Sequence, residues 1–350
     1  MTTKSVRLGH LHQAAGPVLV AILTFLLVGR VAAADPEGFG PFPVRNFQPI
    51  QLLFLGMFGD RAAVIKKGAL DVRVELAETS TIFNEHSTRV NATMKFETLR
   101  SGLFLRYGLT NRLEVGMEIP MLYRYEGFME GAITGVERAL DGVFPFPENP
   151  ARKALKNTGF AYNLTQGGRT RFSGTDQVLG IGDISLLGKY QLMSQTAVAP
   201  TVSLRLAVKV PSGDEGKFFG SGHSDVGIGL AAEKAVAGRW ILHGNVNGVF
   251  PTGRVAGLPL QPIVSGVAAI EYLWSPALSL VAQFDYYSSP FHGTGTPILD
   301  RGVTEVVAGF NYRLRHNLLW QVYGVENADL ITGSAADFTL STLVTYRFGS

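Results

Sequence analysis

The sequence lacks cysteine, is poor in charge and has only one long apolar run. Without cysteine no disulfide framework can form, and no lipid-accepting cysteine follows the N-terminal region. Only 17% of the residues are charged, whereas a soluble domain usually carries about 25%. The 46% of apolar residues argue against a disordered chain. A helical membrane protein needs several apolar runs of about 20 residues, so that class is excluded too.

The one apolar run predicts a secretory signal peptide. Lys4 and Arg7 precede an apolar stretch at 17–28, and small residues at 31–34 come directly before Asp35. A basic start, a short apolar stretch and an A-x-A-like site are its three parts. The alternatives are a buried core helix and an uncleaved anchor. We therefore expect a leader at 1–34.

The net charge of +3 belongs to this leader. Cleavage removes Lys4, Arg7 and Arg30 and no acidic residue, so 28 of the 31 basic residues remain against 28 acidic ones. The mature chain is then neutral, and no nucleic-acid partner is expected.

The dominant pattern after residue 69 is strict alternation of apolar and polar residues. It is clearest at 70–76, 113–119 and 202–210, and it places successive side chains on opposite faces of a strand. Similar runs lie at 96–109, 181–192, 225–234, 239–250, 263–274, 277–287, 303–314, 317–326 and 337–348. Twelve strands of about ten residues are predicted, which is the length of a tilted membrane crossing.

Connection lengths favour a membrane barrel. The predicted turns are short at 110–111, 237–238, 275–276 and 315–316 and near Ser194. The connections after strands one, three, five, seven, nine and eleven are expected to be long and polar. An outer-membrane barrel has this pattern of short periplasmic turns and long external loops. A soluble sandwich needs a charged exterior, and a propeller needs a repeat of 40–50 residues that is not apparent here. The fold class is thus all-β, with the barrel at 69–350.

Residues 35–68 precede the first predicted strand but are too apolar for a solvated tail. We expect a periplasmic segment or a plug in the barrel, with Leu52, Phe54 and Phe58 as plug candidates. The alternatives are an extra edge strand and a patch at the membrane interface.

The faces opposite the apolar ones should line the lumen. The candidates are Glu114, Glu118, Asp183, Lys189, Arg205, Lys209, Asp285, Arg313 and Arg347. Acids and bases are mixed, so no ring of one sign predicts strong ion selectivity. A conducting lumen and a narrow lumen filled by ion pairs both fit, because twelve strands lie between filled and open barrels.

Several segments together resemble a known family. They are 40–49 (GPFPVRNFQP), 106–116 (RYGLTNRLEVG), 127–133 (GFMEGAI), 182–184 (GDI) and 209–213 (KVPSG). The chain is similar to bacterial outer-membrane barrels catalogued as domain of unknown function three-one-eight-seven. The same phrases look like those of outer-membrane proteins of phenol-degradation pathways. The resemblance implies a barrel in the bacterial outer membrane and no known activity.

The strand ends suggest two partners. Aromatic residues such as Tyr107, Trp240, Trp274 and Tyr312 lie towards strand ends, where rings can contact the interface of the membrane lipids. The last strand ends at Phe348 and resembles the signal read by the barrel-assembly machinery, although two small residues follow the aromatic one. We expect a monomer.

An enzyme is less well supported. Some outer-membrane barrels are lipid hydrolases, which need a serine activated by a histidine. His243 lies in a predicted strand, and Ser221 and His223 lie in a glycine-rich loop. No nucleophile, base and orienting group come together in sequence, no metal cluster is apparent and no cofactor is expected.

The longest predicted loop, 124–177, contains apolar residues at helical spacing. They are Phe128, Ile133, Val136, Leu140 and Phe144. A short amphipathic helix is expected there, as a lid, on the outer leaflet or packed on other loops.

The reading favoured by the sequence is a passive outer-membrane channel or transporter for small molecules, hydrophobic ones included. The alternatives are a structural barrel with a filled lumen and an outer-membrane lipid hydrolase.

Overall fold

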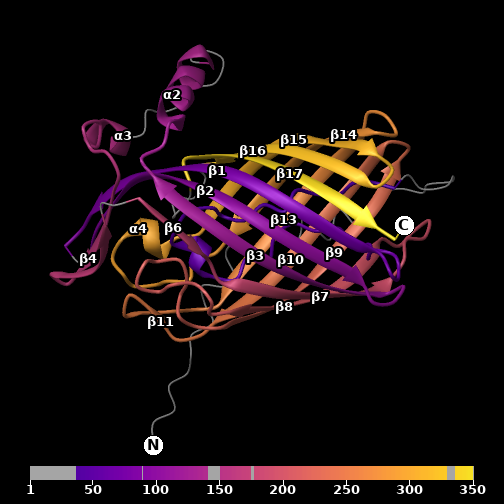
Figure 1. The fold of residues 1–350 in the computed structure, drawn as a ribbon, viewed down its shortest axis with the longest axis horizontal. Coiled ribbons are helices and arrows are strands. Elements are labelled where there is room, and N and C mark those ends of the chain that lie inside the picture. The colour runs from indigo at the N-terminus through magenta and orange to yellow at the C-terminus, as the bar shows by residue number, and fades with distance from the viewer. Residues whose placement is uncertain (1–36, 89, 141–149, 175–176, 329–335, 350) are drawn as a thin grey trace, which may run out of the picture.

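The computed structural model describes residues 37–88, 90–140, 150–174, 177–328 and 336–349 (Figure 1). The expected signal peptide lies outside these ranges, as does Phe144. Among the described residues, no helix has the length and apolar character needed to cross a membrane.

Twelve antiparallel strands close into one barrel, as predicted (Figure 1). They are β1 (Leu70–His86), β2 (Val90–Gly108), β3 (Leu113–Tyr125), β7 (Ile184–Met193), β8 (Thr201–Val210), β9 (Asp225–Ala237), β10 (Trp240–Pro251), β13 (Ile263–Leu273), β14 (Leu278–Tyr287), β15 (Val303–Arg315), β16 (Leu318–Asn327) and β17 (Phe338–Phe348). The barrel closes because β1 pairs with β2 on one side and with β17 on the other.

Alternation separates two faces on each strand. In β8 the side chains of Leu206 and Val208 are exposed, whereas those of Arg205 and Lys209 are buried inside the barrel. A soluble sheet buries its apolar face, so this inverted arrangement is that of a transmembrane barrel with a lipid-facing exterior.

One predicted loop is wrong. The connection between the first two strands was expected to be long, but β1 has 17 residues and β2 has 19, and they pair as far as His86 and Asn91. The alternation continues there because Phe83, Ala92 and Met94 are buried on the inner side. The hairpin closes at Ser87, whose N–H donates to the carbonyl oxygen of Val90 at 2.8 Å.

Short elements complete the long-loop end. They are β4 (Ala161–Gln166), β5 (Arg169–Gly174), β6 (Val178–Ile181), β11 (Arg254–Val255), β12 (Leu258–Pro259) and the helices α2 (Met129–Leu140), α3 (Pro150–Ala154) and α4 (Pro297–Asp300). The predicted helix of the longest loop is α2, whose first amides, at Phe128 and Met129, donate to the carboxylate of Glu97. In Figure 1 this helix stands away from the barrel, and Phe128 is 72% exposed, so α2 does not cover the mouth.

Residues 37–69 lie inside the barrel and form what we call the luminal segment. Its rising limb, 37–50, starts near the short turns and runs towards the long loops, where a 3-10 helix, η1 (Gln51–Leu53), forms the tip. The returning limb, 54–69, runs back to the short-turn end and continues into β1. Indigo coil is visible between the strands in Figure 1.

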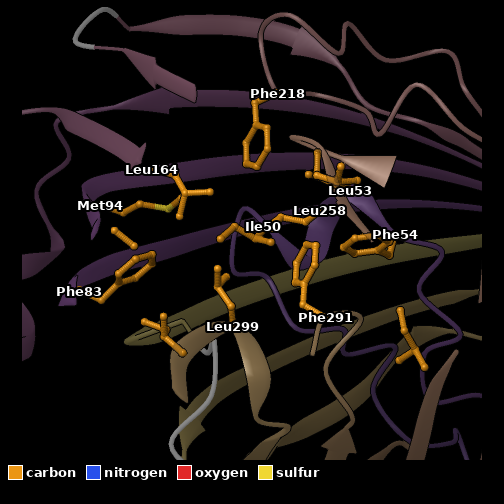
Figure 2. Packing of buried hydrophobic residues seen from close by; sticks show 14 of the residues in the cluster. Ile50, Leu53, Phe54, Phe83, Met94, Leu164, Phe218, Leu258, Phe291 and Leu299 are labelled. Atoms are coloured by element: carbon orange, nitrogen blue, oxygen red, sulfur yellow. The ribbon is translucent and has the colours of Figure 1, made fainter. Parts of the chain in front are cut away.

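The tip of the luminal segment packs into an apolar cluster at the long-loop end, which we call the outer cluster. Its members include Ile50, Leu53, Phe54, Phe83, Met94, Leu164, Phe218, Leu258, Phe291 and Leu299 (Figure 2). The rings of Phe54 and Phe291 meet edge to face, with centroids 5.8 Å apart. The luminal segment is thus buried at its tip by apolar contacts and along its limbs by polar ones.

Candidate functional site

The barrel wall holds the rising limb by its main chain. The carboxylate of Glu271, on β13, accepts hydrogen bonds from the N–H groups of Phe39 at 2.9 Å and Gly40 at 3.1 Å. The side chain of Gln283, on β14, accepts from the N–H of Phe42 at 2.9 Å and donates to its carbonyl oxygen at 3.1 Å. These bonds replace the water that an unpaired buried backbone needs.

The returning limb is held in the same way near the tip. Lys209 Nζ donates to the carbonyl oxygen of Leu53 at 2.5 Å and to Asp183 at 2.7 Å. Asp225 accepts from the N–H of Leu55 at 2.8 Å and lies 3.3 Å from the same ammonium group. A buried lysine and two acids thus fix the tip of the luminal segment.

Asp60 is the charged centre of the returning limb. Its carboxylate lies 2.7 Å from Arg106 and 3.2 Å from Lys189, and its N–H donates to Asn245 at 2.7 Å. Burial alone would raise the pKa of Asp60, but the positive charges of Arg106, Lys189 and Arg205 outweigh it and hold the pKa well below its usual range. Asp60 is therefore ionised and paired with the wall.

Two arginines bridge the rising limb and the wall near the middle of the barrel. Arg100, on β2, is fully buried and forms ion pairs with Glu75 and Glu118 on the neighbouring strands. Arg45, on the luminal segment, lies 2.7 Å from Glu118. Because removing one member of such a network leaves a charge buried and unpaired, the network holds its parts together strongly.

The structure places the nine predicted lumen residues inside the barrel or at its ends. Eight contact a partner by charge, hydrogen bond or ring: Glu114 with Lys189, Glu118 with Arg45, Asp183 with Lys209, Arg205 with Phe58, Asp285 with Gln283, Arg313 with Phe39 and Arg347 with Asp71. Asp183 lies in the bend between β6 and β7 rather than in a strand. Of the predicted plug residues, Phe54 and Phe58 are buried and Leu52 is half-buried.

Sequence reasoning missed several charged residues of this interior. Glu75 lies two residues after Arg73 on the inward face of a perfectly alternating run, so alternation alone was enough to find it. Arg100 and Glu233 lie in predicted strands whose inward faces were not assigned. Arg45 and Asp60 belong to the luminal segment, for which no period gives a face.

The serine and histidine candidates do not form a catalytic pair. Ser221 Oγ donates to the carbonyl oxygen of His223 and accepts from Lys209, so it does not contact the imidazole. His243 lies inside the barrel, with Nε2 2.9 Å from Glu271 and Nδ1 3.6 Å from Glu233. The part of the chain that the structure describes also brings together no three residues able to hold a metal ion.

Two cavities lie at opposite ends of the interior. The inner vestibule, at the short-turn end, has a volume of about 440 Å³ and is lined by both limbs of the luminal segment and by the wall. A second cavity of about 370 Å³ lies at the long-loop end, where Tyr162, Phe218 and Val255 line it. The luminal segment and the outer cluster lie between the two.

A closed twelve-stranded barrel with a lipid-facing exterior and a segment of its own chain in the lumen defines a plugged transmembrane β-barrel. The chain belongs to the family described as protein of unknown function (DUF3187), whose model matches residues 18–348. Comparison with curated proteins gave no match.

Solved structures show the same fold. The COG4313 outer membrane channel from Pseudomonas putida F1 matches with 14% identity and a TM-score of 0.53, over 82% of this chain and 98% of the other. The NanC porin matches with 10% identity and a TM-score of 0.44, over 79% and 98%. The Ralstonia pickettii toluene transporter TbuX matches with 11% identity and a TM-score of 0.38, over 93% and 99%.

Proposed function

We propose that the protein is a channel of the bacterial outer membrane for small molecules, hydrophobic ones included, and that the luminal segment is its gate. In this proposal the chain reaches the membrane after loss of residues 1–34. The fold shared with an outer membrane channel supports the channel role.

The observation that carries the proposal is that the gate is separate from the wall. All twelve barrel strands pair with one another without residues 37–67. The luminal segment is held mostly by single side-chain bonds, such as those from Arg205 and Lys209. It can therefore withdraw without breaking the sheet, whereas a purely structural filling needs no such independence.

The outer cluster supports apolar solutes. Withdrawal of the tip would leave the apolar side chains of Phe218, Phe291 and Leu299 facing the opening. Apolar surface at a binding site favours solutes that lose their own hydration on entry.

A reversible disulfide tests the gate. The Cγ of Met57 lies 3.2 Å from the position that a Cβ on Gly227 would take, so cysteines at these two positions are within bridging range. The native chain contains no cysteine, so Met57→Cys/Gly227→Cys would form a single bridge. We expect the oxidised protein to remain closed in planar bilayers and a reductant to restore openings.

The single variants Met57→Cys and Gly227→Cys are the matched controls and should not respond to the reductant. Equal conductance of the oxidised and reduced double variant would remove the gate. If wild type and both redox states never conduct, while accumulation of a labelled aromatic hydrocarbon by cells also does not depend on the protein, the structural barrel replaces the channel.

A further inference from the structure

The inner vestibule has an excess of positive charge. Its basic residues are Arg61, Lys66, Arg73, Arg106, Lys189, Arg313, Arg315 and Arg347, and its acidic residues are Glu37, Asp60, Asp71 and Glu114. Each of the four acids already forms an ion pair with one of these bases. The remaining positive charge has no acid to neutralise it inside the vestibule.

Arg73 and Arg313 carry this excess. Among the described residues, neither has a carboxylate within the 4.0 Å of an ion pair. Arg73 donates through Nε to Thr345 at 2.9 Å, which orients the guanidinium and leaves its two terminal nitrogens free for a ligand. Arg313 lies over the ring of Phe39, with its Cζ 4.6 Å from the ring centroid.

The two arginines face the same space from two sides. Strand pairing places Arg313, Leu319, Thr345 and Arg73 in one row across four neighbouring strands, β15, β16, β17 and β1. With strands about 4.8 Å apart, the Cα atoms of Arg73 and Arg313 are at most about 14 Å apart. Two extended arginine side chains can span that gap with a small ligand between them.

The vestibule also offers apolar surface beside the charges. The ring of Phe39, the ring of Pro41 and the side chain of Leu319 line it. A cavity of about 440 Å³ is within the usual size of small-molecule sites. An arginine fork matches the two oxygens of a carboxylate, and its planar face packs on aromatic rings.

We propose that the inner vestibule binds small aromatic carboxylates, with the carboxylate between Arg73 and Arg313 and the ring against Phe39 and Leu319. The inference deepens the proposed function because it names a class of solute for the channel. Binding at equilibrium does not require the gate to open, so the site is testable on the closed protein.

The experiment is calorimetric titration of the purified full-length barrel in detergent with sodium 2-naphthoate, corrected for uptake by empty micelles. Wild type should bind it, and Arg73→Gln/Arg313→Gln should weaken binding by about tenfold or more, since charged hydrogen bonds are lost. Arg73→Lys/Arg313→Lys should recover part of the affinity. Arg112→Gln, on an exposed turn at the same end, is the matched control and should bind as wild type.

Two further ligands separate the charge from the ring. Neutral 2-naphthalenemethanol and sodium acetate should each bind at least about tenfold more weakly than naphthoate if both parts of the site contribute. Equal binding of acetate would show an inorganic-type anion site and overturn the aromatic part of the proposal. No binding of naphthoate by wild type, or unchanged binding by a folded glutamine variant, would overturn the site itself. Conductance that fails while naphthoate binds would count against the channel and not against the site.

Discussion

Arg205, on the barrel wall, donates a hydrogen bond of 2.8 Å from Nη2 to the carbonyl oxygen of Phe58 on the luminal segment. A charged side chain thus holds a main-chain atom, and Lys209 treats Leu53 in the same way. The wall binds the path of the luminal segment more than its side chains. Substitutions in the wall should therefore loosen the segment even when its own sequence is unchanged.

Arg205→Met should increase the time that the channel spends open. The substitution removes the donor to Phe58 and keeps most of the apolar stem. A hydrogen bond from a charged group contributes about 1.5–3 kcal/mol, which corresponds to roughly a tenfold to hundredfold shift in the ratio of open to closed states. Planar-bilayer recordings measure this ratio, and Arg112→Met on an exposed turn is the control. Unchanged gating of Arg205→Met would mean that this bond does not hold the gate.

The alternation of the sequence predicts the barrel but cannot predict these contacts. Period two assigns Arg205 and Lys209 to one face of a strand whatever lies opposite. Their partners Phe58 and Leu53 lie about 150 residues away in a segment without periodicity. The loop expected after the first strand also became a strand, because local polarity did not reveal that Phe83 and Met94 are covered by the tip of the luminal segment.

Leu230→Lys tests the lipid-facing exterior. Leu230 lies in the middle of β9 and is 49% exposed, with apolar neighbours on the adjacent strands. A lysine near the bilayer midplane costs about 2–4 kcal/mol. We expect a lower folded fraction after refolding into lipid vesicles, measured by heat-modifiable migration in gels. Leu230→Met should fold as wild type. Equal folding of the lysine variant would place Leu230 outside the hydrocarbon region.

Arg100→Met should destabilise the barrel. Arg100 is buried between Glu75 and Glu118, so the substitution leaves two acids facing each other without the shared cation. Breaking a buried ion pair typically costs about 3–5 kcal/mol. Urea unfolding in vesicles, followed by tryptophan fluorescence, should show an earlier midpoint.

The companion variant Arg100→Met/Glu75→Gln/Glu118→Gln removes the unpaired charges as well and should recover much of the lost stability. If the triple variant is less stable than Arg100→Met, the loss arises from packing and not from stranded charge.

Phe54→Ala should loosen the tip of the luminal segment selectively. Phe54 is 5% exposed and meets Phe291 edge to face, whereas Leu52, two residues away on the same tip, is half-buried. Truncating a buried phenylalanine costs about 3–5 kcal/mol, and truncating a half-buried leucine costs less. Hydrogen exchange at the amides of residues 50–58 should accelerate strongly in Phe54→Ala and weakly in Leu52→Ala. The amides of β8 and β9 should stay protected in both variants, because the strands pair without the segment. Equal acceleration in the strands would instead show that the luminal segment is part of the barrel core and cannot move on its own.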